Sequence, residues 1–218
     1  MISVVIPTLN AAATLGPCVA AVREADEILV VDGGSGDGTP AIAGRHGARL
    51  LASAPGRGVQ LAAGASAAAG DWLLFLHADT RLAPGWRAAA DRHIARRPGR
   101  AACFRLRLDA GEWQARLVEA GVALRVRLFA LPYGDQGLLI PRRLHDAIGG
   151  YRPLPLMEDV DLARRIGRGR LERLEVDATT SAERWRRDGW LRRSLRNLLC
   201  LGLYRSGMSA DRVARLYG

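Results

Sequence analysis

Several acidic and basic side chains in this sequence stand directly after hydrophobic runs, where the end of a strand would present them to a ligand. Asp32 follows one such run and opens the glycine-rich segment 32–39. Its carboxylate could accept hydrogen bonds from a base or a ribose, and the glycines, Gly33 first, would let a ligand approach the backbone. The alternative is a turn in which Asp37 or Thr39 caps the next helix. The segment lacks the Gly-Lys-Ser/Thr ending of a phosphate-binding P-loop.

A second cluster, His77-Ala78-Asp79, follows the apolar run 72–76. A carboxylate in this position could hold a hard divalent cation that bridges two phosphates, and such a cation neutralises the charge on a leaving diphosphate. Otherwise, Asp79 is a turn or cap residue. Arg57 stands between two glycines just before a predicted helix, which suits phosphate binding, although any one of 32 basic residues is weak evidence.

The second half of the chain offers two further acidic groups. Glu158 and Asp159 fall in the first turn of a predicted helix, where acidic residues are common because they complement the helix dipole. The functional alternative is a carboxylate base that removes a proton from an acceptor hydroxyl. Asp135 and Gln136 lie between two glycines, in what is either a tight turn or a flexible loop on the acceptor side.

These residues need a scaffold, and the N-terminal half alternates predicted strands and helices. Strands are expected at 2–6, 27–31, 48–52 and 72–76, and helices at 12–23, 40–46, 58–69 and 85–97. Such alternation predicts a parallel, doubly wound sheet, and ligands of these sheets bind beyond the carboxyl ends of the strands. Four polar clusters fall at those ends: Thr8–Asn10, Asp32–Asp37, Arg57 and His77–Asp79.

The second half is less regular but completes an α/β fold. Strands are expected at 101–108, 138–140 and 171–176, and helices at 117–131, 156–166, 190–204 and 209–216. The expected architecture is a mostly parallel sheet flanked by helices, with a helical extension at the C-terminus. We expect one domain over residues 1–218, made of a ligand-binding half (1–100), a catalytic half (101–180) and a basic helical tail (181–218).

The composition is basic but does not indicate a nucleic-acid partner. The net charge is +10, yet all 32 basic residues are arginines, a bias typical of genome composition. No basic stripe interleaved with aromatic residues and no helix-turn-helix pattern is present. The tail carries nine arginines and three acidic residues, so it could face solvent or anionic lipid. Helix 190–204 suits a membrane interface or a core or dimer contact equally, because Leu191, Leu195, Leu198 and Leu199 lie on one side near Arg192, Arg193 and Arg196.

The cysteines and the termini bear on location. Cys18, Cys103 and Cys200 form no CxxC pair, so we expect buried thiols in a reducing compartment. The N-terminus lacks the features of a signal peptide, and no apolar run is long enough to span a membrane. We therefore expect a cytoplasmic protein, with peripheral contact at the inner face of the cell membrane as an open alternative.

Taken in order along the chain, five segments resemble those of the family-2 glycosyltransferases with the GT-A fold. They are Val4-Val5-Ile6-Pro7-Thr8-Leu9-Asn10, Val31-Asp32-Gly33 through Gly38-Thr39, Leu76-His77-Ala78-Asp79, Gly149-Gly150-Tyr151, and Glu158-Asp159. Three further segments are similar to those of a small single-domain bacterial subgroup: Gly56-Arg57-Gly58-Val59-Gln60, Gly134-Asp135-Gln136-Gly137 and Arg184-Trp185.

The resemblance implies an inverting transferase that uses a nucleotide sugar, with a UDP-sugar favoured, and a divalent cation, Mn²⁺ or Mg²⁺. It implies Asp159 as the catalytic base beside Glu158, and Asp79 as the metal ligand, with His77 as a candidate second ligand. The acceptor is expected to be a hydroxyl compound that could be lipid-linked. The residues expected around the donor are Pro7, Thr8, Asn10, Asp32, Gly33, Arg57, Ala78 and Asp79. The residues expected on the acceptor side are Asp135, Gln136, Arg184 and Trp185.

Two departures from the family pattern limit this reading. His77 replaces the first aspartate of the DxD element, although an imidazole could still assist a softer metal. Segment 181–185 keeps only the end of the QxxRW element of processive members, so we expect a single transfer rather than polymerisation. The alternatives are a degenerate transferase that only binds nucleotides or polyanions, and a sugar-nucleotidyltransferase, which would normally need catalytic lysines that this chain lacks.

Overall fold

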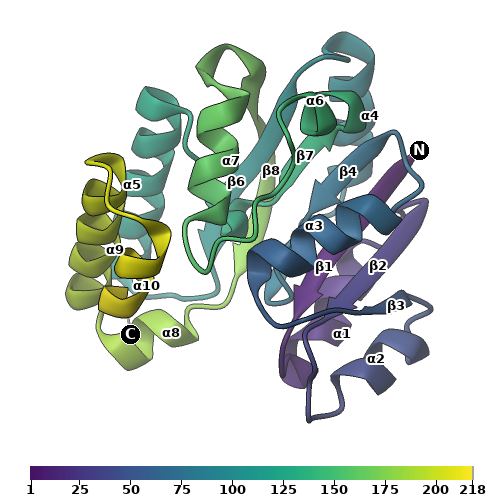
Figure 1. Ribbon diagram of the computed structural model, residues 1–218, viewed down its shortest axis with the longest axis horizontal. Coiled ribbons are helices and arrows are strands. Elements are labelled where there is room, and N and C mark those ends of the chain that lie inside the picture. The colour runs from purple at the N-terminus through teal and green to yellow at the C-terminus, as the bar shows by residue number, and fades with distance from the viewer. Residues whose placement is uncertain (218) are drawn as a thin grey trace.

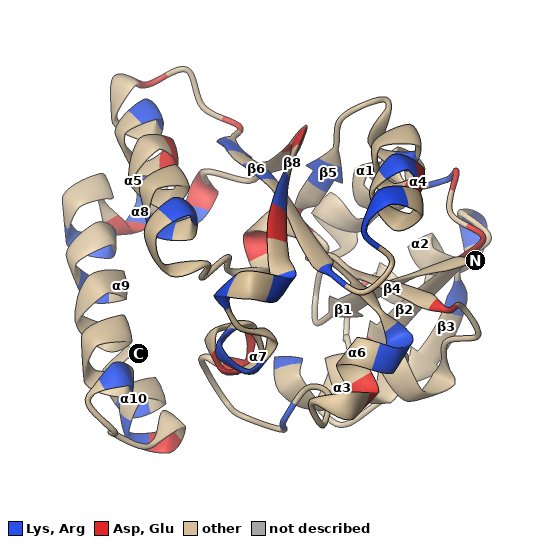
Figure 2. Cartoon of the chain, turned by 90° about the horizontal axis from the view of Figure 1, so that it is seen from above, with Lys and Arg blue, Asp and Glu red and all other residues tan. Residues whose placement is uncertain are grey.

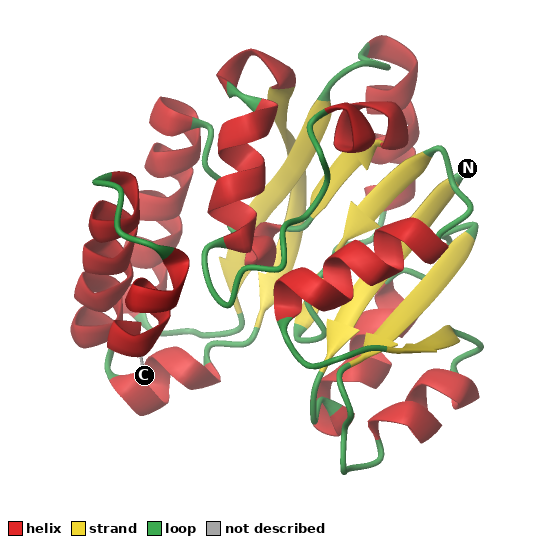
Figure 3. Cartoon of the chain, viewed as in Figure 1, coloured by secondary structure: helices red, strands yellow, loops and turns green. Residues whose placement is uncertain are grey.

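A single eight-stranded sheet runs through the protein, with helices on both faces (Figures 1 and 3). The structure is a computed structural model that describes residues 1–217. The order of strands is β3-β2-β1-β4-β7-β6-β8-β5. The α/β architecture with C-terminal helices that we expected from the sequence is therefore confirmed.

The N-terminal half supplies four parallel strands and three helices. β1 pairs with β2 on one side and with β4 on the other, and β2 pairs with β3, all in parallel. These strands run in the same direction, so their carboxyl ends meet at one edge of the sheet. The elements are β1 (Ile2–Thr8), α1 (Ala12–Ala21), β2 (Glu27–Asp32), α2 (Thr39–Arg45), β3 (Arg49–Ala52), α3 (Arg57–Ala67) and β4 (Trp72–Phe75).

The second half joins through an antiparallel strand. β7 lies between β4 and β6 and is antiparallel to both, whereas β6 and β8 are parallel and β5 is antiparallel to β8. The elements are β5 (Thr80–Leu82), α4 (Trp86–Arg96), β6 (Ala101–Leu108), α5 (Trp113–Phe129), the 3₁₀ turn η1 (Gly134–Gln136), β7 (Leu138–Pro141), α6 (Arg142–Ala147), α7 (Glu158–Ile166), the 3₁₀ turn η2 (Arg168–Arg170), β8 (Leu171–Thr180), α8 (Glu183–Asp188), α9 (Trp190–Arg205) and α10 (Ala210–Tyr217).

The apolar runs that predicted strands are buried on both faces. In β1, the side chains of Val4 and Ile6 belong to a core with α1, α2 and α4, whereas Val5 belongs to a core with α3, α6 and α7. Successive residues of a strand point to opposite faces, so a sheet covered on both sides needs continuous apolar strands. This is the reason why β1, β2 and β4 consist largely of hydrophobic residues, whereas the edge strand β3 is mostly exposed.

Three short elements were not predicted, namely β5, α6 and α8. The buried thiols expected at Cys18, Cys103 and Cys200 are confirmed, since all three cysteines are free and buried. Within residues 1–217, no helix combines the length and the apolar character needed to cross a bilayer.

Candidate active site

The loops after β1 and β2 are tied to each other at the carboxyl edge of the sheet. The carboxylate of Asp32 accepts hydrogen bonds from the hydroxyl groups of Thr8 (3.0 Å) and Ser35 (2.5 Å) and from the backbone N–H groups of Gly34 and Ser35. Burial opposes the ionisation of Asp32, but these hydrogen bonds outweigh it and lower its pKa. Asp32 is thus an ionised group that organises the turn after β2.

Gln60 of α3 holds the ends of the same two strands together. Its buried amide nitrogen donates to the carbonyl oxygens of Thr8 (2.7 Å) and Val31 (2.8 Å). α3 can approach these strands closely because Gly64 faces them, where a Cβ atom would collide with Val5 of β1. We had quoted Gln60 only as part of a motif, so its positioning role comes from the structure.

Two adjoining cavities open at this edge of the sheet. We call the first the strand-end cavity; it has a volume of about 520 Å³ and is lined by the loop after β1, by α3 and by the loop after β4. Its size falls in the range of roughly 300–1,000 Å³ that is common for ligand sites. We call the second the acidic cavity; it has a volume of about 150 Å³ and lies between η1, α7, α8, α9 and α10. The residues that line both cavities are Arg57, His77, Asp79, Ser181 and Arg184.

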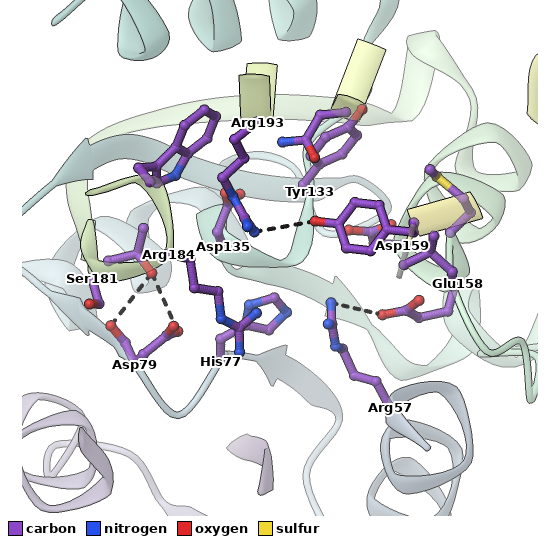
Figure 4. A pocket seen from close by; sticks show the side chains of 16 residues that line it. Arg57, His77, Asp79, Tyr133, Asp135, Glu158, Asp159, Ser181, Arg184 and Arg193 are labelled. Carbon is purple, nitrogen blue, oxygen red and sulfur yellow. Dashed lines mark hydrogen bonds and ion pairs between the residues drawn. The ribbon is translucent and has the colours of Figure 1, made fainter. Parts of the chain in front are cut away.

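Arg57 links the two cavities electrostatically (Figure 4). Its Nη1 atom lies 3.2 Å from Oε1 of Glu158, whose side chain is 2% exposed. Burial opposes the charge on Arg57, but the carboxylates of Glu158, Asp159 and Asp79 outweigh it and raise the pKa of the guanidinium. Burial, and then the neighbouring Asp159, raise the pKa of Glu158 against the influence of Arg57.

Asp159 begins α7 beside Glu158 and is fixed by two backbone donors. Its Oδ2 atom accepts a hydrogen bond from Gly134 N (2.9 Å), and its Oδ1 atom accepts one from Val160 N (2.7 Å). The first bond connects α7 to the Gly134–Gln136 turn. The carboxylate lines the acidic cavity, so it can still meet an acceptor there.

The carboxyl group of Asp135 faces the same cavity, and its pKa is raised. Burial raises its pKa to about 6, against the influence of Arg125, and the negative charge of Asp159 adds to the shift. Considering residues 1–217, its buried Oδ1 atom has no hydrogen-bond partner. Tyr133, which also lines the cavity, is held by the guanidinium of Arg125, stacked 3.5 Å from the centre of its ring.

His77 and Asp79, the two candidate metal ligands, both line the two cavities. Burial and the positive charges of Arg57 and Arg184 lower the pKa of His77 well below its ordinary value, so its imidazole is neutral. Asp79 lies between the cavities, and one of its oxygens, Oδ1, accepts a hydrogen bond from the Thr180 hydroxyl (3.3 Å).

Across the described chain, no group of three or more His, Cys, Asp or Glu side chains is arranged to hold a metal alone. Mg²⁺ is commonly bound by one or two carboxylates together with substrate phosphates and water. The carboxylate of Asp79 fits that pattern, whereas the neutral nitrogen of His77 suits a softer metal than Mg²⁺.

The C-terminal helices close one side of the acidic cavity. Arg184 and Trp185 of α8 line it, and Trp185 stacks on Trp190 with ring centres 5.8 Å apart. Arg193 of α9 lies over Trp185 and donates a hydrogen bond to the Tyr217 hydroxyl (3.2 Å). Arg193, Asn197 and Tyr217 therefore belong to the cavity wall, although we had not selected them from the sequence.

The structure gathers most of the predicted site residues, but not all of them. As far as the described residues show, Asp32, Gly33 and Gln136 lie outside the lining of both cavities. Gln136 is buried, and its amide donates to the carbonyl oxygen of Phe104 (3.1 Å). The residues that do line a cavity are Pro7, Thr8, Asn10, Arg57, His77, Ala78, Asp79, Asp135, Glu158, Asp159, Arg184 and Trp185.

The missed residues on α9 had a weak signal in the sequence. Arg193, Asn197 and Leu201 recur at intervals of four residues, so they share one side of a helix. The leucines on the opposite side of the same helix form a stronger pattern than these three residues do. Nothing in the sequence indicated that Tyr217, at the end of α10, returns to the site.

Comparison with known proteins places this geometry in a family. The model of the family described as "Glycosyl transferase family 2" matches residues 3–154. The match covers more than two thirds of the chain, and it ends just before Glu158 and Asp159.

Solved structures share the fold at low sequence identity. Glucosyl-3-phosphoglycerate synthase from Mycobacterium tuberculosis, in complex with Mn²⁺, uridine diphosphate and phosphoglyceric acid, is 22% identical with a TM-score of 0.57, over 83% of this chain and 69% of that one. TarS residues 1–349 from S. aureus is 14% identical with a TM-score of 0.65, over 99% of this chain and 70% of that one. The same TarS segment in complex with UDP-GlcNAc is 16% identical with a TM-score of 0.62, over 82% and 58% of the two chains.

The fold, the order of the motifs and the extent of the family match agree, and the chain belongs to glycosyl transferase family 2.

Proposed function

We propose that this chain is an inverting transferase that moves a sugar from a nucleoside diphosphate sugar, with a UDP-sugar favoured, to an acceptor hydroxyl. The observation that carries the proposal is that Asp159 and Asp79 line one connected pair of cavities, with Arg57 shared between them. A donor diphosphate and a base for the acceptor can thus be held side by side. UDP is favoured because the structural neighbours from M. tuberculosis and S. aureus were solved with UDP or UDP-GlcNAc.

In this proposal, the strand-end cavity receives the nucleotide. Pro7, Thr8 and Asn10 line its wall, and Ala78 and Asp79 present the diphosphate side. Asp32 acts on the donor by fixing the loops after β1 and β2, since its carboxylate oxygens already accept four hydrogen bonds. A Mn²⁺ or Mg²⁺ ion held by Asp79, with His77 beside it, would neutralise charge on the diphosphate.

The acidic cavity receives the acceptor. The acceptor oxygen attacks the anomeric carbon, the bond from that carbon to the diphosphate oxygen breaks, and the hydroxyl proton passes to the carboxylate of Asp159. Arg57 and Arg184 lie where the negative charge of the leaving diphosphate develops, so they stabilise it. Glu158 holds Arg57 in place through their ion pair.

Calorimetric titration of UDP and of GDP, with and without Mn²⁺, tests the donor side. We expect metal-dependent binding of UDP that is lost in Asp79→Ala. Asp71→Ala is the matched control, because Asp71 is an exposed aspartate just before the opposite end of β4. Failure of both nucleotides to bind under any condition would exclude UDP and GDP donors and favour a non-catalytic protein.

The base is tested with Asp159→Asn. This variant should bind UDP and Mn²⁺ like the wild type, whereas hydrolysis of the UDP-sugar should fall by about 10²–10⁴-fold, the usual contribution of a general base. Asp91→Asn, on the exposed surface of α4, serves as the control. Unchanged turnover in Asp159→Asn would remove this residue from the mechanism.

A further inference from the structure

Two neighbouring helices leave apolar side chains on the molecular surface. Within the described residues, nine of the thirteen exposed large apolar side chains lie on α5 and α9. Single exposed apolar residues are normal, but a contiguous group marks an interaction site. The members that we call the apolar stripe are Trp113, Leu117, Leu124 and Leu128 of α5, and Leu191, Leu195, Leu198 and Leu199 of α9.

The stripe residues occupy the outward side of each helix. In α5, Trp113, Leu117, Leu124 and Leu128 are 44–68% exposed, whereas Val122 and Val126 are buried against β6. The spacing of four, seven and four residues keeps the exposed group on a single face. Helices in globular proteins normally bury their apolar face, so in α5 and α9 a second apolar face remains uncovered.

α5 and α9 run in the same direction alongside each other at one end of the molecule (Figures 1 and 2). Near their starts, Trp190 of α9 and Ala115 of α5 belong to the same apolar cluster. At their ends, the guanidinium of Arg205 lies 5.3 Å from the ring centre of Phe129. The two exposed faces are therefore matched in length and lie next to each other.

Arginines border the stripe, and two of them form no ion pair within the described residues, although Arg127 shares a cavity with Glu172 and Glu175 of β8. Exposed Arg127 of α5 and Arg192 of α9 form no ion pair with residues 1–217. α9 contains no acidic residue, and the single acidic residue of α5, Glu119, is buried between Arg107 and Arg116. Arg193 and Arg196, which the sequence suggested as part of this border, instead pair with Asp188.

We propose that the apolar stripe and its bordering arginines form a docking face for an anionic lipid surface. Leucines and an exposed tryptophan enter the boundary between headgroups and acyl chains, and arginines beside them meet lipid phosphates. A second copy of this chain suits the face less well, because a two-fold contact would join two arginine-bearing faces whose helices α5 and α9 offer no exposed acidic partner. The positive charge of the bordering arginines therefore favours an anionic bilayer as the partner of this face.

The docking face lies directly behind the acidic cavity. Arg193 and Asn197 line the cavity from one side of α9, and Leu191, Leu195 and Leu198 cover the other. A helix with its side chains is about 10–12 Å across. A docked molecule therefore holds its cavity about one helix diameter from the headgroups.

Vesicle flotation of the full chain tests the docking face. The probes are vesicles of phosphatidylcholine alone and of phosphatidylcholine mixed with phosphatidylglycerol. We expect binding to the anionic vesicles that weakens with added salt, because surface electrostatics are screened. The double variant Leu117→Gln/Leu195→Gln should lose this binding, and Arg127→Gln and Arg192→Gln should each weaken it about fivefold.

Matched controls separate the face from general effects of charge and folding. Leu50→Gln changes an exposed leucine on β3, and Arg45→Gln an exposed arginine on α2, so both should bind vesicles like the wild type. UDP binding by every variant reports folding and is measured separately, so this proposal can fail without the proposed function failing. The proposal is overturned if the double leucine variant binds vesicles as well as the wild type does. It is also overturned if the wild type does not bind vesicles but forms a dimer that the leucine substitutions disrupt.

Discussion

At the scale of single residues, the carboxyl groups of the acidic cavity differ in what holds them. Asp159 accepts two backbone N–H groups at the start of α7, Glu158 faces the guanidinium of Arg57, and Asp135 keeps one oxygen without a partner in the described chain. Asp159 is thus the member of the group whose orientation is fixed by the backbone, since one donor belongs to α7 and the other to the Gly134–Gln136 turn.

Asp135 should make the protein less stable as the pH rises. Its pKa is about 6 in the folded state against an ordinary value of 3.8, so the folded state binds the proton more tightly than the unfolded state. Its contribution is fully present below pH 3.8 and is lost as the pH rises through 6. One pKa unit equals about 1.4 kcal/mol, so the loss is at most about 3 kcal/mol.

Asp135→Asn removes this titration, and urea unfolding at pH 4 and pH 7.5 measures the result. The variant should gain stability relative to the wild type as the pH rises between these values. Asp91→Asn, on the exposed surface of α4, should show no such change. A constant difference between Asp135→Asn and wild type at both pH values would contradict the expected linkage.

The predictable part of the site is the part that follows strands of the sheet. Thr8 ends β1 and Asp79 follows β4, so periodicity indicated their positions, whereas Asp159, in the first turn of α7, was named from the order of motifs. Arg193 and Tyr217 reach the cavity through contacts between α8, α9 and α10, and those contacts depend on packing that spacing does not encode. Gln136 looked like a loop residue, yet its amide satisfies a buried backbone carbonyl in β6.

At the scale of elements, most strands of the sheet have a hydrophobic pattern that predicts them from the sequence. The short elements that connect them do not. The strand Ala101–Leu108 was predicted with the bounds that the structure has. β5 has three residues and was missed, because its pairing with β8 (Thr80 opposite Thr180) comes from a distant part of the chain. α6 and α8 have six residues each, too short for a period to show.

Two helical glycines differ in the space around them, so replacing each with alanine should have opposite effects on stability. A Cβ atom on Gly64 of α3 would collide with Val5 of β1 and lie 2.8 Å from Val31 of β2, whereas one on Gly121 of α5 would meet nothing within 4 Å. Gly64→Ala should therefore destabilise the protein by about 1–3 kcal/mol through overpacking. Gly121→Ala should stabilise it by about 0.5–1 kcal/mol, because alanine is the better helix former.

Chemical denaturation of both variants measures these effects, and each variant is the control for the other. Their substitutions are identical, so the difference between them isolates the closeness of α3 to the sheet. A Gly64→Ala variant as stable as Gly121→Ala would mean that α3 can move away from β1 and β2 at little cost.

At the scale of the whole molecule, the arginines differ in whether a neighbouring carboxylate neutralises their charge. Arginines are spread over both halves, as the blue segments of Figure 2 show. Many of them are paired with carboxylates, as Arg105 is with Asp177 and Arg165 with Asp161. The proposed docking face therefore depends on the arginines that form no ion pair within residues 1–217, rather than on the net charge of +10.

The donor should connect the two halves of the sheet, because the strand-end cavity is lined from both. Residues 7–11 come from the loop after β1, while Ser181 and Arg184 follow β8. UDP with Mn²⁺ should therefore slow amide hydrogen exchange in both segments, and it should leave the exposed face of α5 unchanged. At a concentration of 100 Kd, binding adds about 2.7 kcal/mol, which for a chain of this size raises the Tm by roughly 5–10 °C.

Asp79→Ala is the control, since it should abolish both the protection and the rise in Tm while keeping the fold. Protection confined to the loop after β1 would show that α8 takes no part in donor binding, and Arg184 would then belong to the acceptor side alone. Protection of both segments without Mn²⁺ would instead show that Arg57 and Arg184 hold the diphosphate by themselves. In that case, guanidinium groups would neutralise the negative charge of the leaving group. His77, which replaces the first aspartate of the DxD element, would then be a feature of such a site.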